Sequence, residues 1–124
     1  MSGVKKNIIS ASLNGNLLED FNQNGFLILD KFIDLQYLDK LRKRIEPLFR
    51  GEFETGIEPD EWNWKYGRDP NDVTRQICNA WKSDNLIKKI VCNSIIGECV
   101  SKLMGWKGAR LLQDNVLWKP PLGK

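Results

Sequence analysis

Three side chains near the end of the sequence, Gln113, Asn115 and Lys119, carry hydrogen-bond donors at even spacings along the chain. Successive side chains of a β-strand point to opposite faces, so in a strand these donors share a face with Leu111 and Leu117. The other face would also mix apolar and polar groups, namely Arg110, Leu112, Asp114, Val116 and Trp118. A strand that lines a polar pocket has this composition, and so does a strand at the edge of a sheet. Both interpretations stay open at this point.

The sequence contains no histidine, which excludes several kinds of catalytic site. A Ser-His-Asp triad, a Cys-His pair and a zinc deaminase site all need this side chain. A 2-His-1-carboxylate iron site cannot be built from this chain alone either. The three cysteines lack Cys-x-x-Cys spacing, so a structural zinc site is also excluded. We expect Cys92 and Cys99 to pack as small hydrophobic side chains.

Composition and charge indicate a folded protein without an obvious polyanionic partner. The chain has 124 residues, of which 41% are hydrophobic and 28% charged, so it can form a packed core. Its net charge of +3 is too small to indicate nucleic-acid binding, and its apolar runs are too short to span a membrane. The N-terminus has no sustained apolar region that would mark a signal peptide. We therefore expect no nucleic-acid or membrane partner and an intracellular location, with the cytoplasm as the default.

Capping residues and apolar spacing predict the helices. After an irregular lead-in over residues 1–16, a short helix is expected over Leu17–Asn24, with Gly25 as its C-cap. Asp34 is a candidate N-cap for an amphipathic helix over 35–48, with Pro47 in its last turn. Two more helices are expected, one that Asp84 caps and one over residues 95–104 that closes at a glycine.

Strands are predicted at two places. Phe26–Leu29 is a compact apolar run whose length favours a buried strand over a helix. Alternation predicts a second strand over Ala109–Lys119, which the two prolines after Lys119 must end, because proline has no N–H to donate to a ladder. Residues 74–81 give no clear pattern. Small isolated sheets are marginally stable, so we expect an α+β chain that is the N-terminal part of a larger fold.

Residues 51–72 form a long, acidic region that glycine and proline interrupt. A loop of this length inside a domain is unusual and often functional. Trp62, Trp64 and Tyr66 alternate within it, as in a short strand or a flap that faces a substrate. Structural packing of these aromatic rings is the favoured interpretation.

The order of these features resembles the N-terminal half of the phytanoyl-CoA dioxygenase family, whose members are iron(II)- and 2-oxoglutarate-dependent oxygenases. Phe21–Leu29 (FNQNGFLIL) is similar to the family's opening F-x-x-x-G-(F/Y) strand, and the helix over 35–48 is similar to the next element. Leu103-Met-Gly105 resembles the L-x-G that ends a later helix. Gln113–Pro121 (QDNVLWKPP) is similar to the family's Q-x-x-x-x-x-K-P-P strand. The likeness covers nearly the whole chain, loosely between residues 51 and 74.

The resemblance implies a fold, a reaction and a set of site residues. The fold would be the N-terminal helices and first strands of a double-stranded β-helix (jelly-roll or cupin-like), with the barrel incomplete in residues 1–124. In the family, a His-x-Asp pair after the K-P-P strand and a distal His hold the iron, and a C-terminal Arg binds the far carboxylate of 2-oxoglutarate. We expect these ligands beyond Lys124, so this chain alone should bind neither iron nor 2-oxoglutarate productively and should be inactive.

Seven residues are candidates for the site that the resemblance implies. The parent enzyme would hydroxylate a small organic substrate. Asn115 matches a position that faces 2-oxoglutarate, Gln113 shares its face, and Lys119 matches the lysine of K-P-P. Arg75 lies where some relatives place a basic residue near the co-substrate. Trp62, Trp64 and Tyr66 fall in the region of the family's variable substrate loops.

A second hypothesis needs no further chain. The helix over 35–48 carries four cations on one face, and an interaction module of 124 residues could bind an anionic partner through it. A solvated helix face is the simpler interpretation, since no aromatic residues interleave with the cations. The four residues are Lys40, Arg42, Lys43 and Arg44.

Overall fold

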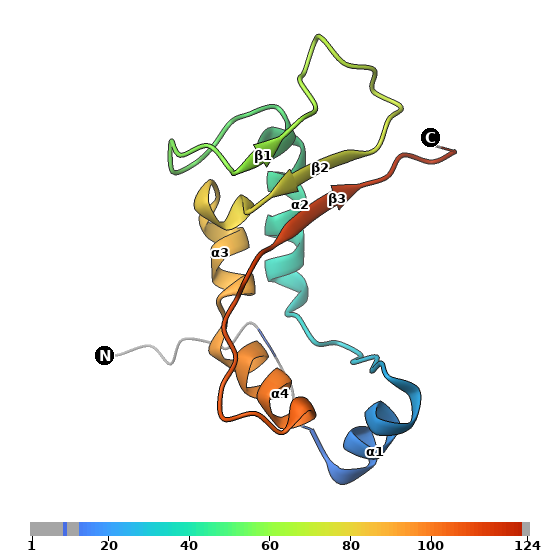
Figure 1. The fold of residues 1–124 in the computed structure, drawn as a ribbon. Helices are drawn as coiled ribbons and strands as arrows, with labels where there is room; N and C mark the ends of the chain where they lie inside the picture. Colours follow the sequence, from blue (N-terminus) through green and yellow to red (C-terminus); the bar gives the residue numbers. More distant parts are fainter. Residues whose placement is uncertain (1–8, 10–12, 123–124) are drawn as a thin grey trace. The chain divides into compact units, whose positions relative to one another are not determined.

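The computed structural model describes residue 9 and residues 13–122 and shows a mixed α+β chain (Figure 1). The α+β class predicted from the sequence is therefore confirmed. The chain divides into two units, each with its own internal contacts. The first combines Met1–Asp39 with Cys92–Arg110, and the second combines Lys40–Val91 with Leu111–Lys124. No helix in the described part of the chain is both long and apolar enough to cross a membrane.

The first unit contains two helices whose ends follow the local sequence. Helix α1 spans Gly15–Asn24, and the Asn14 side chain accepts a hydrogen bond from the Leu17 N–H at its start. Gly25 ends it in the left-handed conformation that a C-cap requires, as predicted, although the helix begins two residues earlier than expected. Helix α4 spans Ser94–Met104 and closes at Gly105, also as predicted.

The strand predicted at Phe26–Leu29 is wrong. These residues have no regular structure, and Phe26 and Ile28 are 61% and 76% exposed. An apolar run becomes a strand only where a neighbouring segment supplies a hydrogen-bonded ladder. Among the described residues of this unit, the β pairing is a single bridge between Ile9 and Ile33, which lies outside the run.

Helix α2, over Leu35–Phe49, extends from the first unit into the second. Asp34 caps its start, since its Oδ1 accepts a hydrogen bond from the Tyr37 N–H at 3.2 Å. Pro47 lies in the last turn and has no N–H to donate to the carbonyl of residue 43, and the helix ends two residues later. The predicted helix and its cap are therefore confirmed. Its apolar stripe is confirmed from Leu41 onward, where Leu41, Ile45 and Leu48 pack in or against the core, whereas Leu35 is 75% exposed.

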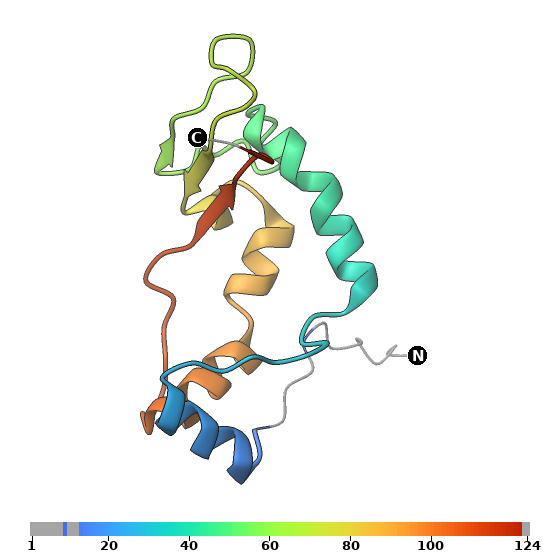
Figure 2. The same ribbon diagram turned by 90° about the vertical axis from the view of Figure 1, so that its right-hand side faces the viewer.

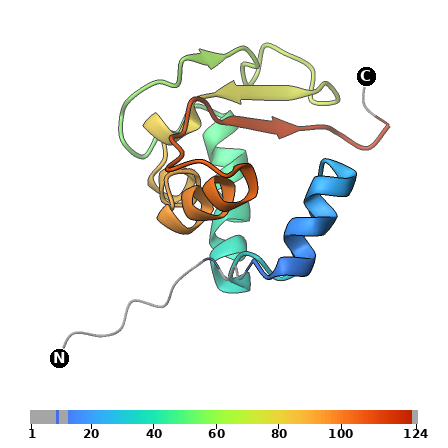
Figure 3. The same cartoon turned by 60° about the horizontal axis from the view of Figure 1, so that its bottom comes forward.

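The second unit contains a three-stranded antiparallel sheet in the order β1-β2-β3. The strands span Glu61–Trp62, Arg75–Cys78 and Asn115–Trp118, and the 3-10 helix η1 (Ala80–Lys82) and helix α3 (Asn85–Val91) follow β2. Figure 3 shows the strands as one layer, with the ribbon of α2 on one side of it. The residues that form the hydrophobic core come from α2, the loop after β1, β2, η1 and α3: Leu48, Phe49, Trp64, Ile77, Ala80 and Ile87.

Strand β3 is shorter than the strand predicted over Ala109–Lys119. Residues 109–114 belong to no strand, because the pairing with β2 covers only Asn115–Trp118. Figure 2 shows β2 and β3 running side by side in opposite directions. Within the described residues β3 is an edge strand of a single small sheet, and the larger double-stranded β-helix stays a proposal.

Asp84 links α2 to α3 from a fully buried position. Its Oδ1 accepts hydrogen bonds from the Leu86 and Ile87 N–H groups at 2.9 and 3.2 Å, which caps α3 as the sequence predicted. Its Oδ2 accepts a hydrogen bond from Arg44 Nε at 2.7 Å. The single carboxylate thus satisfies two orphan N–H groups and holds a cation of α2.

We predict that Asp84→Ala lowers the free energy of unfolding by about 2–4 kcal/mol, because both the cap and the partly buried ion pair are lost. Asp84→Ser keeps a capping oxygen and should lose less. Urea unfolding followed by tryptophan fluorescence measures both. The exposed Asp72→Asn variant is the matched control and should unfold like the wild type; equal stability of Asp84→Ala and Asp72→Asn would contradict the role of the buried carboxylate.

Candidate functional site

The register of β2 and β3 sorts their side chains onto two unlike faces. Arg75 pairs with Trp118 and Ile77 with Val116, and these four side chains lie on the face that packs into the core. Gln76 pairs with Leu117, and Cys78 pairs with Asn115, on the opposite face. We call this opposite face the donor face, because it carries three side chains with donor groups, Gln113, Asn115 and Lys119.

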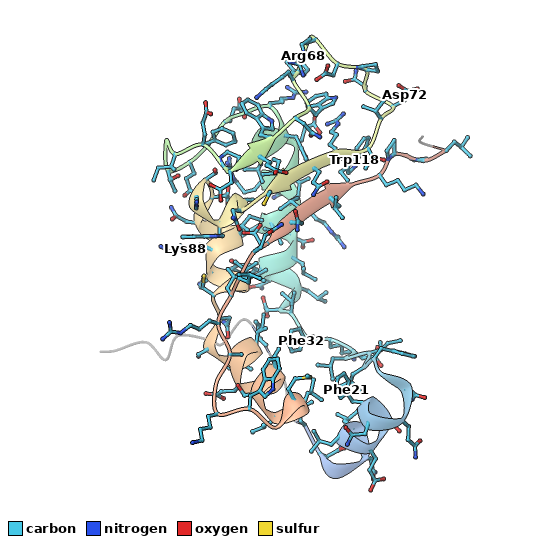
Figure 4. All side chains as sticks on the ribbon, in the orientation of Figure 1. Phe21, Phe32, Arg68, Asp72, Lys88 and Trp118 are labelled. Atoms are coloured by element: carbon cyan, nitrogen blue, oxygen red, sulfur yellow. The ribbon has the colours of Figure 1, made fainter. Side chains whose placement is uncertain are left out.

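All three donors predicted from the sequence lie exposed, in strict alternation with inward-facing neighbours. Gln113, Asn115 and Lys119 are exposed, whereas Asp114 is buried and Trp118 is partly buried. The alternation predicted for this segment is therefore confirmed from residue 113 onward, with the donors away from the core. Figure 4 labels Trp118 beside β3, whose ribbon passes in front of α2 in this view.

The amide of Asn115 is held by a residue that the sequence did not single out. Gln76 Nε2 donates a hydrogen bond to Asn115 Oδ1 at 3.0 Å across β2 and β3. Gln76 lies in the segment whose structure was not predictable from its pattern. Nothing in a single sequence indicates such a pair, since it depends on which residues the register places together.

Arg75 does not join the other three proposed co-substrate residues, because it lies on the opposite face of the sheet. Its side chain is 5% exposed, and its guanidinium carbon lies 3.8 Å from the centroid of the Trp64 ring and 4.3 Å from that of Trp118. Arg75 Nη1 also donates to Glu46 Oε2 of α2 at 3.2 Å. The grouping of Arg75 with Gln113, Asn115 and Lys119 is therefore corrected: Arg75 stabilises the core side of the sheet that they face away from.

A reciprocal pair of hydrogen bonds fixes the start of β3 against the end of β2. The Asn79 N–H donates to the Asp114 carbonyl at 2.9 Å, and the Asp114 N–H donates to Asn79 Oδ1 at 3.2 Å. The buried Asp114 carboxylate accepts the N–H groups of Ala80 and Trp81 at 3.1 and 3.0 Å, which caps η1. The sequence held a usable signal for Asp114, because a carboxylate on the inward face of a strand needs partners.

The aromatic residues of the 51–72 region divide between packing and exposure. Trp62 Nε1 donates to the Phe49 carbonyl at 3.0 Å, and Trp64, which is buried, donates to the Pro70 carbonyl at 2.8 Å. A Cβ at Gly51, whose φ is +85°, would overlap the Trp62 ring, so glycine is needed there. Tyr66 differs, since it is 60% exposed beneath Arg50. Figure 4 shows Arg68 and Asp72 in the same loop, beyond the end of the sheet.

The four cations proposed as a basic face on α2 are not equivalent. Arg44 forms an ion pair with the buried carboxylate of Asp84, and its Nη2 donates a hydrogen bond to the Glu52 carbonyl at 2.9 Å. Lys40, Arg42 and Lys43 are exposed. Internal contacts hold Arg44, so the four cations do not form one uniform solvent-facing group.

The acidic residues beside the sheet are partly neutralised by their own neighbours. Hydrogen bonds from Lys82 Nζ and from Asn79 Nδ2, each 2.6 Å long, lower the pKa of Asp60. Glu61 of β1 pairs with Cys78 of β2 and therefore lies on the donor face. Burial, and then the charges of Glu61 and Asp60, raise the pKa of the Cys78 thiol, which disfavours the reactive thiolate form.

Iron does not fit the residues of this chain. The sequence has no histidine, and nowhere in residue 9 or residues 13–122 do three or more Cys, Asp or Glu side chains gather as a metal site would require. The donor face fits a different ligand, because two amides and one ammonium group can donate to an anion.

Comparisons with known proteins give no relative for the chain: no family model, no curated protein and no solved structure matches it.

Cys78 should react slowly with thiol reagents in the folded chain. We predict that iodoacetamide at pH 8 modifies Cys78 at least about tenfold more slowly than the exposed Cys92, because burial and nearby carboxylates disfavour the thiolate. Mass spectrometry of the digested protein gives both rates. The difference should vanish in urea; equal rates in the folded chain would contradict the placement of Cys78 between β1 and β3.

Arg75→Ala should destabilise the sheet, since it removes a buried guanidinium that lies against two indole rings. We predict a loss of about 2–4 kcal/mol in the free energy of unfolding. The exposed Arg110→Ala variant should change it by less than about 0.5 kcal/mol. Thermal unfolding followed by circular dichroism gives the unfolding temperature of each variant. Equal unfolding temperatures for Arg75→Ala and Arg110→Ala would show that Arg75 does not stabilise the core.

Proposed function

We propose that this chain forms the N-terminal part of an iron(II)/2-oxoglutarate-dependent dioxygenase that resembles the phytanoyl-CoA dioxygenase family and hydroxylates a small organic substrate. One observation carries the proposal: β3 and the residues beside it in the chain expose Gln113, Asn115 and Lys119, while Val116 and Trp118 of β3 pack against a hydrophobic core. These are three of the four residues that the resemblance assigns to the co-substrate, and the fourth, Arg75, lies on the core face.

The sidedness of the sheet suits the wall of a barrel. In a double-stranded β-helix, each strand presents one face to the interior and the other to whatever covers the barrel. Here the covered face receives Leu48 and Phe49 of α2, and β3 leaves its outer edge unpaired among the described residues. We propose that further strands outside the described residues pair with that edge and enclose the donor face.

The chemistry of the donor face suits a dicarboxylate. 2-Oxoglutarate carries two negative charges at neutral pH, and carboxylates only accept hydrogen bonds. Asn115 and Gln113 each offer amide N–H groups, and Lys119, four residues after Asn115 and just past the end of β3, adds a positive charge. Hydrogen bonds between donors and an ionised carboxylate are about twice as strong as neutral ones.

Iron binding falls to residues outside this chain in our proposal. The 124 residues supply no imidazole, so the His-x-Asp pair and the distal His of the family would have to come from further sequence. This chain alone is then inactive, and its part is to position the co-substrate. Tyr66 is the residue of the 51–72 loop that we assign to the substrate, because the rings of Trp62 and Trp64 are used in packing.

The proposal predicts that the 124-residue chain binds 2-oxoglutarate weakly, in the millimolar range or tighter, by isothermal titration calorimetry. Asn115→Leu and Lys119→Met should each weaken binding by about tenfold, because each removes a donor to a charged group. Lys88→Met, which removes a cation from α3, is the matched control and should bind like the wild type.

Two outcomes would overturn the proposal. The first is no binding of 2-oxoglutarate by the wild-type chain at low ionic strength. The second is equal weakening by Lys119→Met and Lys88→Met, since general charge attraction would then explain the binding. The dimethyl ester of 2-oxoglutarate, which lacks both charges, serves as a ligand control and should not compete.

A further inference from the structure

We infer that Gln76 is a positioning residue that fixes the amide of Asn115 so that its N–H₂ group is presented to an acceptor-only anion. This inference rests on the proposed function, because it assumes that the donor face receives 2-oxoglutarate. It adds a residue that the resemblance does not supply, and it states which atom of Asn115 meets the ligand.

The geometry places the two amides as diagonal neighbours on the same face. Gln76 pairs with Leu117 and Cys78 pairs with Asn115, and the inward-facing Ile77–Val116 pair separates these two rungs, so Gln76 and Asn115 follow one another diagonally along the same face of the β2–β3 ladder. Diagonal neighbours on one face of a sheet are within reach of long side chains. The donor is Gln76 Nε2 and the acceptor is Asn115 Oδ1, 3.0 Å apart.

The direction of this bond determines what Asn115 can bind. An asparagine amide has one oxygen that accepts and one nitrogen that donates, and a half-turn of the side chain exchanges them. Because Oδ1 is used by Gln76, Nδ2 is the end that remains for a ligand. A carboxylate oxygen can accept from Nδ2, whereas Oδ1 in the same place would repel it.

The surrounding charges favour an anion at the Lys119 end of the donor face. Glu61 lies on this face but on β1, two strands from Asn115, and neighbouring strands are about 4.8 Å apart. At about 10 Å its repulsion is largely screened in physiological salt. Lys119 directly follows β3 in the chain. Gln76 adds a donor without adding a charge.

The pair contributes little to folding, which points to a role in binding. Both side chains reach solvent, and an exposed neutral hydrogen bond of this kind is replaced by water at small cost. By contrast, Asn79 after β2 and Asp114 before β3 form a partly buried hydrogen-bond network that fixes the register of the two strands. A substitution at Gln76 should therefore leave unfolding unchanged and alter ligand binding.

Three variants of the full 124-residue chain test this inference with 2-oxoglutarate as the probe. Gln76→Met removes the donor without adding charge and should weaken binding about threefold to tenfold. Gln76→Glu can only accept at pH 7, so Asn115 must turn, and binding should fall more than tenfold. Leu117→Glu adds the same charge on the same face but leaves the Gln76–Asn115 bond intact, and it should weaken binding less than Gln76→Glu.

Two further measurements distinguish an effect on the orientation of the Asn115 amide from an effect on folding or on charge alone. The Asn115 side-chain N–H₂ resonances should shift in Gln76→Glu without ligand and stay unchanged in Leu117→Glu. Below the ordinary glutamate pKa of about 4.3, the carboxyl group introduced by Gln76→Glu is protonated and can donate a hydrogen bond to Asn115 again. The 2-oxoglutarate affinities of the wild type and of Gln76→Glu should therefore differ less at such a pH than at pH 7. Leu117→Glu has no hydrogen bond to restore and should show a weaker pH dependence.

The outcomes distinguish this inference from the proposed function. If the wild-type chain binds 2-oxoglutarate and Gln76→Met binds equally well, the inference fails while the proposed function stands. Equal loss in Gln76→Glu and Leu117→Glu would likewise overturn it, because charge alone would then account for the loss. If the wild-type chain does not bind 2-oxoglutarate at all, both fail together.

Discussion

The structure of the second unit depends on the register between β2 and β3, which the Asn79–Asp114 pair fixes. A slip of one residue would move every side chain of β3 to the opposite face. Trp118 would then leave the guanidinium of Arg75, and Asn115 would turn into the core. The buried Asp114 carboxylate resists such a slip, because it would lose the two N–H groups of η1 that it caps.

This register links the stability of the sheet to its proposed chemistry. On one face, Arg75 lies between the Trp64 and Trp118 rings and holds Glu46 of α2. On the other, Gln76 and Asn115 form an exposed amide pair. Arg75 and Gln76 are adjacent in sequence but serve opposite sides of the sheet. We therefore expect substitutions at Arg75 to change unfolding and substitutions at Gln76 to change binding.

Local sequence signals were enough to predict the helices. The strands were harder to predict, because they depend on pairing between residues far apart in the sequence. The caps at Asp34, Asp84 and Gly25 follow from short-range hydrogen bonding, so a single sequence is enough to predict them. The strand expected at Phe26–Leu29 failed because an apolar run does not reveal whether a partner exists. The alternation of exposed donors over residues 113–119 was predictable from the sequence. The faces of Arg75 and Gln76 were not, because β2 becomes a strand only by pairing with distant residues.

The most direct test is a map of the 2-oxoglutarate contacts by ¹⁵N-edited NMR of the 124-residue chain. Our account predicts that shift changes concentrate at Gln113, Asn115, Lys119 and the Gln76 side chain, while Ile77 and the Arg75 guanidinium on the core face stay unchanged. Changes concentrated instead at Lys40, Arg42 and Lys43 would indicate an anion-binding helix face. Such a result, or no change on the donor face at saturating ligand, would contradict the account.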